Sequence, residues 1–213
     1  MKKAARAFSF LALVCAAASV PAFAGSLYTN TDTNQVPYDV SAFNINTTSY
    51  QPYAISDSFT LSANSTVNSV SFVVWLFSGD SLQSVDWSIG TTAFSGTGTL
   101  AATSGIFDET NGIGYSVYTE TFDVGSLSLS AGTYWLTLDG ALSNYNNGTY
   151  WDESNGASQA EGDLAPNTSP ATIGSESFSI DGTAVVTPEP SSFLLLGSGL
   201  AGLAGMIRRR LKG

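Results

Sequence analysis

The run Val70–Phe77, with the sequence VSFVVWLF, limits the fold of this chain more than any other stretch. It is apolar on both alternating faces and rich in β-branched and aromatic residues, which is typical of a central strand covered on both sides. In the stretch just before it, one alternating face is formed by Ile55, Asp57, Phe59 and Leu61. The alternation predicts a second strand whose apolar face includes an aspartate.

Short strands of the same kind are predicted along most of the chain. They fall at 84–90, 97–103, 115–124, 132–139, 148–151 and 175–180. Turn-forming residues separate these strands, namely Gly, Asn, Asp and Ser. No stretch between the two ends of the chain has apolar residues at the spacing of an amphipathic helix together with helix-capping residues. We therefore expect an all-β fold, an antiparallel β-sandwich, with an open barrel as the alternative. The segment 25–52 is predicted to be rich in loops, with one edge strand.

Charge is distributed unevenly along the sequence. All seven Lys and Arg residues lie at the two ends, whereas no Lys, Arg or His occurs between Gly25 and Ile207, where all 17 acidic residues lie. A surface without cations cannot neutralise phosphates, which excludes nucleic acid and anionic lipid as partners of this region. Its carboxylates must be solvated, hydrogen-bonded or bound to metal. A solvated acidic surface is the simplest interpretation.

The N-terminus has the features of a secretory signal peptide. A basic start precedes an apolar stretch at 8–20, and Ala22 and Ala24 form the small-x-small pattern of a cleavage site before Gly25. The only cysteine, Cys15, lies within the apolar stretch. Acylation as a lipoprotein is the alternative, and it is disfavoured because a valine precedes the cysteine where a small residue is needed.

The C-terminus has three ordered parts. The triplet Pro188, Glu189 and Pro190 is followed by 17 uncharged residues at 191–207 and then by a basic cluster, the arginines Arg208, Arg209 and Arg210. A helix over 191–207 would be about 25 Å long, a little shorter than the roughly 30 Å hydrocarbon core of a bilayer. It would span a membrane only with bilayer thinning or snorkelling at its ends. The basic cluster predicts a cytoplasmic C-terminus.

Glycine is frequent in this predicted helix. Four glycines disfavour a helix buried in a water-soluble core, because each costs up to about 1 kcal/mol in a helix exposed to water. Gly197, Ala201 and Gly205 recur at four-residue spacing and would allow another helix to approach closely. Simple tolerance of glycine in lipid is the alternative.

The three-part C-terminus resembles the PEP-CTERM sorting signal of Gram-negative bacteria. One departure is Thr187, which stands between Val186 and the triplet, where the family has Val directly before it. The resemblance implies recognition by an exosortase, a membrane-embedded processing enzyme, followed by removal of the tail. It also implies export through the inner membrane to the cell surface or extracellular matrix, with the helix as a membrane anchor before processing.

Two internal stretches resemble the jelly-roll ectodomains of many exported proteins with this type of tail. They are DSFTLSANSTVNSVSFVVW, which begins at Asp57, and LSLSAGTYWLTLDG, which begins at Leu127. The resemblance implies a jelly-roll-like sandwich and says little about a ligand.

Composition excludes several kinds of catalysis in the exported region. Without His, Cys, Lys or Arg there is no Ser-His-Asp or Cys-His nucleophile, no Schiff-base lysine and no histidine-ligated zinc. A glycoside hydrolase needs only two carboxyl groups across the scissile bond. The acidic residues that could supply them are Asp108, Glu109, Glu120, Asp152 and Glu153. Solvated loop acids are the simpler interpretation, and we do not expect an enzyme.

A binding site is predicted in the segment 142–156, LSNYNNGTYWDESNG. Tyr145, Tyr150 and Trp151 lie there among asparagines and beside Asp152. Aromatic faces stack on sugars while amides and carboxylates bond to hydroxyl groups, so these four residues are candidates for binding glycan. The alternative is a hairpin whose aromatic side chains pack into the sandwich.

No cofactor is expected, although calcium is an open alternative. Hard cations prefer several oxygen ligands, and Asp152, Glu153, Asn155 or Asp163 could provide them. Their spacing matches no EF-hand loop.

These observations predict a chain of three parts. A signal peptide spans 1–24, an extracellular β-sandwich spans 25–186, and a PEP-CTERM sorting signal spans 187–213 with its hydrophobic helix at 191–207. We expect a surface or matrix protein with a structural or adhesive sandwich. A carbohydrate-binding module for exopolysaccharide is the alternative, and a glycoside hydrolase is a distant third.

Overall fold

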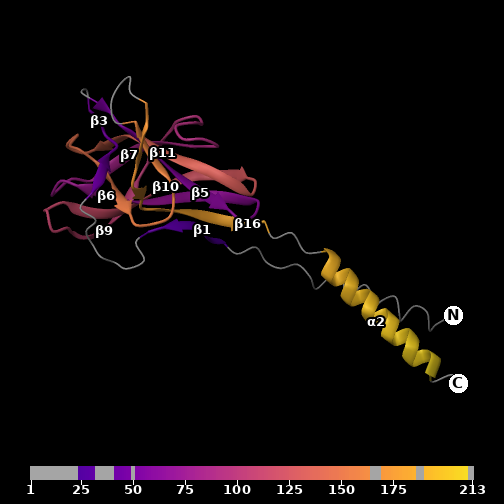
Figure 1. The fold of residues 1–213 in the computed structure, drawn as a ribbon. Coiled ribbons are helices and arrows are strands. Elements are labelled where there is room, and N and C mark those ends of the chain that lie inside the picture. The colour runs from indigo at the N-terminus through magenta and orange to yellow at the C-terminus, as the bar shows by residue number, and fades with distance from the viewer. Residues whose placement is uncertain (1–23, 32–40, 49–50, 164–168, 186–189, 211–213) are drawn as a thin grey trace. The chain divides into compact units, whose positions relative to one another are not determined.

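The computed structural model describes residues 24–31, 41–48, 51–163, 169–185 and 190–210 (Figure 1). Residues 23–185 form one compact unit that contains all the strands among the described residues, and the helix α2 (Pro190–Arg210) belongs to another. Residues 1–23 of the predicted signal peptide, which include Ala22, lie outside the described residues, as do Pro188 and Glu189.

Two antiparallel sheets form the main unit. The larger sheet has the strand order β1 (Ala24–Asn30), β16 (Phe178–Ala184), β6 (Ser65–Leu76), β10 (Ser116–Leu129), β9 (Ser104–Thr110), and it also includes β12 (Tyr150–Ser154), β15 (Ser175–Glu176) and β2 (Ala42–Asn44). The smaller sheet has the order β14 (Ala171–Ile173), β13 (Ala160–Asp163), β5 (Ala54–Leu61), β11 (Gly132–Ser143), β7 (Leu82–Gly90), β8 (Thr99–Ala102). A short pair, β3 (Thr47–Thr48) and β4 (Gln51–Pro52), completes the strands. The predicted all-β, jelly-roll-like sandwich is confirmed.

The strand β6 is central, as its apolar run predicts. One edge of β6 pairs with β10 along most of its length, and the other edge pairs first with β16 and then with β12. The side chains of Phe72 and Val74 point into the core, whereas Trp75 lies on the opposite face and is still 94% buried. Both faces of the end of β6 are therefore covered.

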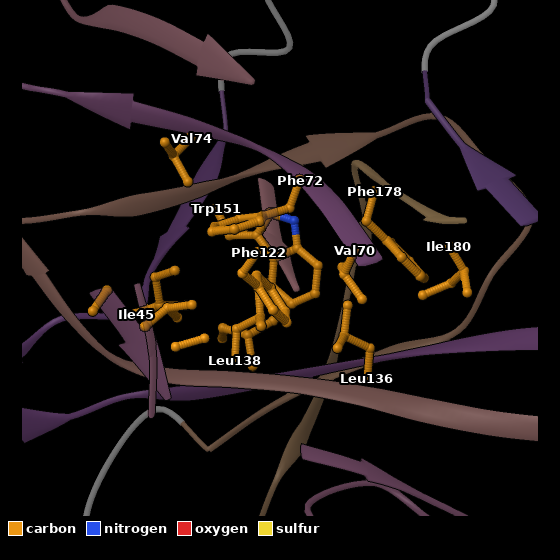
Figure 2. Close-up of a cluster of buried hydrophobic side chains, with 14 of the residues drawn as sticks. Ile45, Val70, Phe72, Val74, Phe122, Leu136, Leu138, Trp151, Phe178 and Ile180 are labelled. Atoms are coloured by element: carbon orange, nitrogen blue, oxygen red, sulfur yellow. The ribbon is translucent and has the colours of Figure 1, made fainter. Parts of the chain in front are cut away.

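The hydrophobic core lies between the two sheets. It brings Phe59 and Leu136 from the smaller sheet against Phe72, Trp151 and Phe178 from the larger one. Figure 2 shows several side chains of this core, with Phe72, Phe122 and Trp151 close together. This packing follows from the alternation of side chains along a β-strand, because every second side chain of β5 and β6 points toward the core.

The first and last strands of the sandwich lie side by side. The strand β1 pairs with β16, so Ala24 lies opposite Thr183 and Asn30 lies opposite Phe178. The segment at 25–52 thus contains an edge strand, as its sequence predicts, and it also contains the short strands β2, β3 and β4, which the sequence did not predict. Gly25, the predicted first residue of the mature protein, lies within that strand.

The chain crosses between the sheets at Thr103. The strand β8 forms one edge of the smaller sheet, and β9 forms one edge of the larger sheet. On β9 the side chains of Ile106 and Phe107 are 73% and 53% exposed. The sequence predicts a strand at 97–103 but no separate strand for β9, because this stretch lacks an alternating apolar face.

Candidate functional site

The four predicted glycan-binding residues do not form one surface. Tyr145 lies in the turn between β11 and β12 and is 69% exposed, while Tyr150 and Asp152 are half-buried on β12. Trp151 is fully buried between the sheets, where its ring contacts Phe72 and Phe178 (Figure 2).

Trp151 is a core residue, so the prediction that it stacks on a sugar is wrong. Its indole Nε1–H donates a hydrogen bond of 3.0 Å to the Ser177 carbonyl oxygen, which satisfies its only polar group. Successive side chains on a strand point to opposite faces, so Tyr150 and Trp151 cannot both face solvent. The adjacency of Tyr150 and Trp151 in a predicted strand already indicated that only one of them could face solvent.

The turn at 143–147 is held in place by one buried carboxylate. Asp80 Oδ2 accepts hydrogen bonds from Ser143 Oγ at 3.1 Å and Asn147 Nδ2 at 3.0 Å, and Asp80 Oδ1 accepts one from the Tyr145 backbone N–H at 3.3 Å. Asp80 itself lies in the turn that begins at Phe77, whose carbonyl oxygen accepts from the Asp80 N–H. The asparagine-rich loop is therefore fixed to the end of β6.

Four aromatic side chains gather on the outer face of the larger sheet at this end. We call the group Trp75, Phe77, Tyr115 and Tyr150 the aromatic surface. The ring centroids of Phe77 and Tyr115 are 5.1 Å apart, those of Tyr115 and Tyr150 are 5.6 Å apart, and those of Trp75 and Tyr115 are 6.0 Å apart. Phe77 is 42% exposed, and both tyrosines are half-buried.

The strand register explains why these side chains share a face. Tyr150 lies directly opposite Trp75, and Trp151 lies opposite Val74, so one pair points outward and the other points into the core. Tyr115 immediately precedes β10 and contacts Phe77 at the end of β6. The sequence does not predict Trp75, Phe77 and Tyr115 as site residues, because their contacts join segments far apart in the chain.

The helix α2 carries the described part of the C-terminal tail. It begins at Pro190 and ends at Arg210, so it is longer at both ends than the predicted 191–207. Proline is tolerated at the first helical position because its missing N–H would have no partner there, and arginines are favourable at a helix C-terminus. Arg208, Arg209 and Arg210 are thus part of the helix and not a segment after it.

Large apolar side chains of α2 are exposed. Leu196, Leu200 and Met206 are between 58% and 65% exposed. A Cβ atom built on any of its four glycines meets nothing within 4 Å, so no contact with the described residues requires glycine there. In the part of the chain that the structure describes, no helix is both long and apolar enough to cross a membrane.

Comparison with known families identifies this tail. A family model described as the PEP-CTERM protein-sorting motif matches residues 186–210. The chain carries a PEP-CTERM sorting motif. The motif implies an exported protein that is sorted by an exosortase. A search of curated proteins found no match to the chain.

The PEP-CTERM match and the structure divide the chain at nearly the same place. The match begins at residue 186, and the last strand of the sandwich, β16, ends at Ala184. The helix α2 lies within the match. The sandwich lies outside the match, so the motif indicates how the protein is sorted and not what the sandwich binds.

A cluster of buried polar groups lies inside the sandwich. Asp57 from β5 and Glu176 from β15 are both fully buried. Asp57 Oδ2 accepts hydrogen bonds from the Glu176 backbone N–H at 2.6 Å and from Ser158 Oγ at 2.9 Å, while Asp57 Oδ1 accepts from the Ser58 N–H at 2.6 Å. Ser158 Oγ also contacts Ser175 Oγ. Asp57 is therefore an acceptor surrounded by donors.

Glu176 has a different environment from Asp57. Neither of its carboxyl oxygens has a hydrogen-bond partner among the residues that the structure describes. Burial raises the pKa of Glu176 well above its ordinary value, and the nearby carboxylates of Asp57, Glu153 and Asp152 raise it further. Burial also raises the pKa of Asp57 to about 6, although the hydrogen bonds to its carboxylate oppose that shift.

The predicted calcium ligands are divided between the two sheets. Asp152 and Glu153 lie on β12 of the larger sheet, whereas Asp163 pairs with Ala54 in the smaller sheet. Asn155 follows β12. Among the described residues, no group of three or more acidic, histidine or cysteine side chains is arranged to hold a metal ion.

The acidic residues considered for glycoside hydrolysis do not share one environment. Glu120 is 98% buried on β10, and burial raises its pKa to about 7. Asp108 is exposed on β9, where its Oδ2 accepts a hydrogen bond of 2.7 Å from Thr119 Oγ1. Asp152 and Glu153 are half-buried on β12. A glycan could therefore reach Asp108 but not the carboxyl group of Glu120.

Proposed function

We propose that this protein is a cell-surface or extracellular-matrix protein of a Gram-negative bacterium, whose acidic sandwich has a structural or adhesive role. The PEP-CTERM match at residues 186–210 is the observation that carries the proposal. A signal peptide at 1–24 would begin export, the sandwich at 25–186 would be the exported domain, and the tail at 187–213 would be the sorting signal. The helix would hold the chain at the membrane until an exosortase removes the tail.

The charge distribution supports this arrangement. The cations lie in the two ends, which the proposed processing would remove, so the mature protein would be purely acidic. A sandwich with high negative charge and no basic side chain stays soluble at a cell surface and is repelled from anionic lipid. We propose no enzymatic activity for the sandwich. Its acidic residues Asp57, Glu120 and Glu176 are buried, and the residues 25–207 contain no His, Cys, Lys or Arg, which most nucleophilic mechanisms use.

The test is to follow the protein in a host with and without its exosortase gene. In the presence of the exosortase, we expect the C-terminal tail to be lost and the sandwich to reach the surface or medium. Without the enzyme, the full tail should remain on protein retained in the membrane fraction. Removal of the tail to the same extent in both hosts would contradict the proposal.

Two variants make the test specific to the motif. Replacing Pro188, Glu189 and Pro190 with alanine should block processing. Changing the three arginines at 208–210 to lysine keeps the positive charge and should leave orientation in the membrane unchanged. The sandwich is identical in both variants, so a difference in location would come from the tail.

Carbohydrate binding is the second candidate function. The aromatic surface favours it, because partly exposed aromatic rings grouped on one sheet face are typical of sites that hold sugars. An exported protein that binds exopolysaccharide would be retained in the matrix without a covalent link.

A further inference from the structure

We propose that the aromatic surface is a binding site for an uncharged polysaccharide chain. The proposal rests on the carbohydrate-binding function and deepens it, because it names the site and the chemical class of the ligand. It places the site on Phe77, Tyr115 and Tyr150, outside the sandwich core, and excludes Trp151.

The aromatic surface is separate from the core that holds the sandwich together. The core cluster contains Phe72, Val74 and Leu76 of β6, whereas Trp75 lies on the other face of the same strand. The outer rings contact one another and not the core rings. The core cluster therefore does not include these four rings, although Trp75 is itself 94% buried.

Phe77 and Tyr150 present apolar area together with a polar group. Phe77 is 42% exposed, and its ring centroid lies 6.4 Å from that of Tyr150. The rings of Tyr115 and Tyr150 also contact each other. Burial raises the pKa of Tyr150, and the neighbouring Tyr115 raises it further. Tyrosine hydroxyl groups beside an exposed ring match the alternating apolar faces and hydroxyl edges of a sugar.

The asparagine-rich turn lies next to the aromatic surface along the chain. Asn144, Asn146 and Asn147 are exposed, and Asp80 fixes their turn to the segment that begins at Phe77. The exposed side chain of Asn144 accepts a hydrogen bond of 3.0 Å at its Oδ1 atom from the Ser81 backbone N–H, which orients its amide N–H₂ group. Amides held in this way can donate to the hydroxyl groups of a sugar.

The acidic charge of the domain favours an uncharged ligand over an anionic one. No Lys, Arg or His occurs between Gly25 and Ile207, so no cation can neutralise a uronic acid, sulfate or phosphate group at this site. An anionic chain would instead meet a domain whose charged side chains are all acidic. The same argument disfavours nucleic acid.

Affinity electrophoresis of the purified full chain tests the proposal. Native gels would contain the neutral or the acidic fraction of the exopolysaccharide from the producing bacterium, or alginate as a defined polyanion. We expect the neutral fraction to slow migration and the two anionic polymers to have no such effect. Equal migration in all gels, or slowing by the anionic polymers alone, would overturn the proposal.

Matched variants locate the site. The double variant Phe77→Ala and Tyr150→Ala should weaken binding to the neutral fraction at least tenfold, and Tyr150→Phe should weaken it less because the ring remains. Phe107→Ala, which removes an exposed ring on β9, should bind like the wild type. Wild-type binding by the folded double variant would show that the ligand lies elsewhere.

The readouts separate this proposal from the sorting function. Near-ultraviolet circular dichroism and the unfolding midpoint would show that each variant is folded. The double variant should still be processed and exported normally, since its tail is unchanged. Loss of export in an exosortase mutant would support the sorting function whatever the gels show.

Discussion

Asp57 and Glu176 join the two sheets inside the sandwich, where the backbone N–H of Glu176 donates a 2.6 Å hydrogen bond to Asp57 Oδ2. The two carboxyl groups come from β5 and β15 and are both fully buried. Elsewhere, buried carboxylates are commonly paired with Lys or Arg, but this domain contains neither. The buried carboxyl groups are therefore stabilised by hydrogen bonds or by being protonated, and not by ion pairs with basic side chains.

The domain should be more stable at acidic than at alkaline pH. The pKa values of Asp57 and Glu120 rise to about 6 and about 7, from ordinary values of 3.8 and 4.5, and that of Glu176 rises well above 4.5. A carboxyl group whose pKa is raised in the folded state stabilises that state below its unfolded pKa, and this advantage is lost as pH rises through the folded value. For Asp57 alone the loss is about 3 kcal/mol. Thermal unfolding should show a higher midpoint at pH 5 than at pH 8, and the reverse order would contradict the assignment.

Glu176→Gln should raise the unfolding midpoint at pH 8 and reduce its dependence on pH. Glutamine has the same shape but no charge, so the cost of a buried, unpartnered carboxylate disappears. Glu161→Gln is the matched control, because Glu161 is only half-buried and the variant makes the same change in net charge. Equal effects of the two variants at pH 8 would show that overall charge repulsion, and not burial of Glu176, governs the stability.

Trp151→Ala should destabilise the sandwich by about 3–5 kcal/mol, as expected for a large buried aromatic side chain. The change would leave a cavity among Phe72 and Phe178 and would remove a hydrogen bond to Ser177. Tyr145→Ala, at an exposed position in the neighbouring turn, should change stability by no more than about 0.5 kcal/mol. Urea unfolding of the two variants measures both values. A small effect at Trp151 would be incompatible with the core described here.

Gly182→Ala should destabilise the pairing of β16 with β6. A Cβ atom at Gly182 would overlap the backbone carbonyl oxygen of Thr66, and relieving that contact would shift a strand at an expected cost of about 1–3 kcal/mol. Gly98→Ala is the control, because a Cβ there meets nothing within 4 Å. Hydrogen exchange of the β16 amides would show the local effect. Unchanged protection in Gly182→Ala would mean that the strands are further apart than described.

Trypsin should leave the exported region intact even after unfolding. The chain has no Lys or Arg between Arg6 and Arg208, so there is no site for the protease within the sandwich. Mass spectrometry of a digest in urea measures the fragments. Chymotrypsin provides the control, since the region is rich in aromatic residues and should be cut. Tryptic fragments from within 25–207 would contradict the sequence.

Alternation allowed much of the sandwich to be predicted from the sequence. It placed Asp57 on the same face as Ile55, Phe59 and Leu61, and all four side chains are buried in the structure. Period-two patterns are local, so they can be read without knowledge of the partner strand. The same rule applied to Tyr150 and Trp151 would have assigned them to opposite faces.

The candidate site itself could not be predicted, because it depends on contacts across the sheet. Tyr115 meets Phe77 and Tyr150 only after three segments are brought together by the register of β6 with β10 and β12. Residues within 142–156 alone cannot form that surface. The burial of the Glu176 carboxyl group could not be predicted either, because it depends on packing against the opposite sheet.

The pairing of β1 with β16 has a consequence for the order of folding. The strand synthesised first has its hydrogen-bond partner in the strand synthesised last, with Ala24 opposite Thr183. Such a long-range contact cannot form while the chain is still emerging, and contacts of this kind slow folding. The sandwich can close this edge only after its last strand has been delivered, while the sorting tail at 186–210 is still to follow.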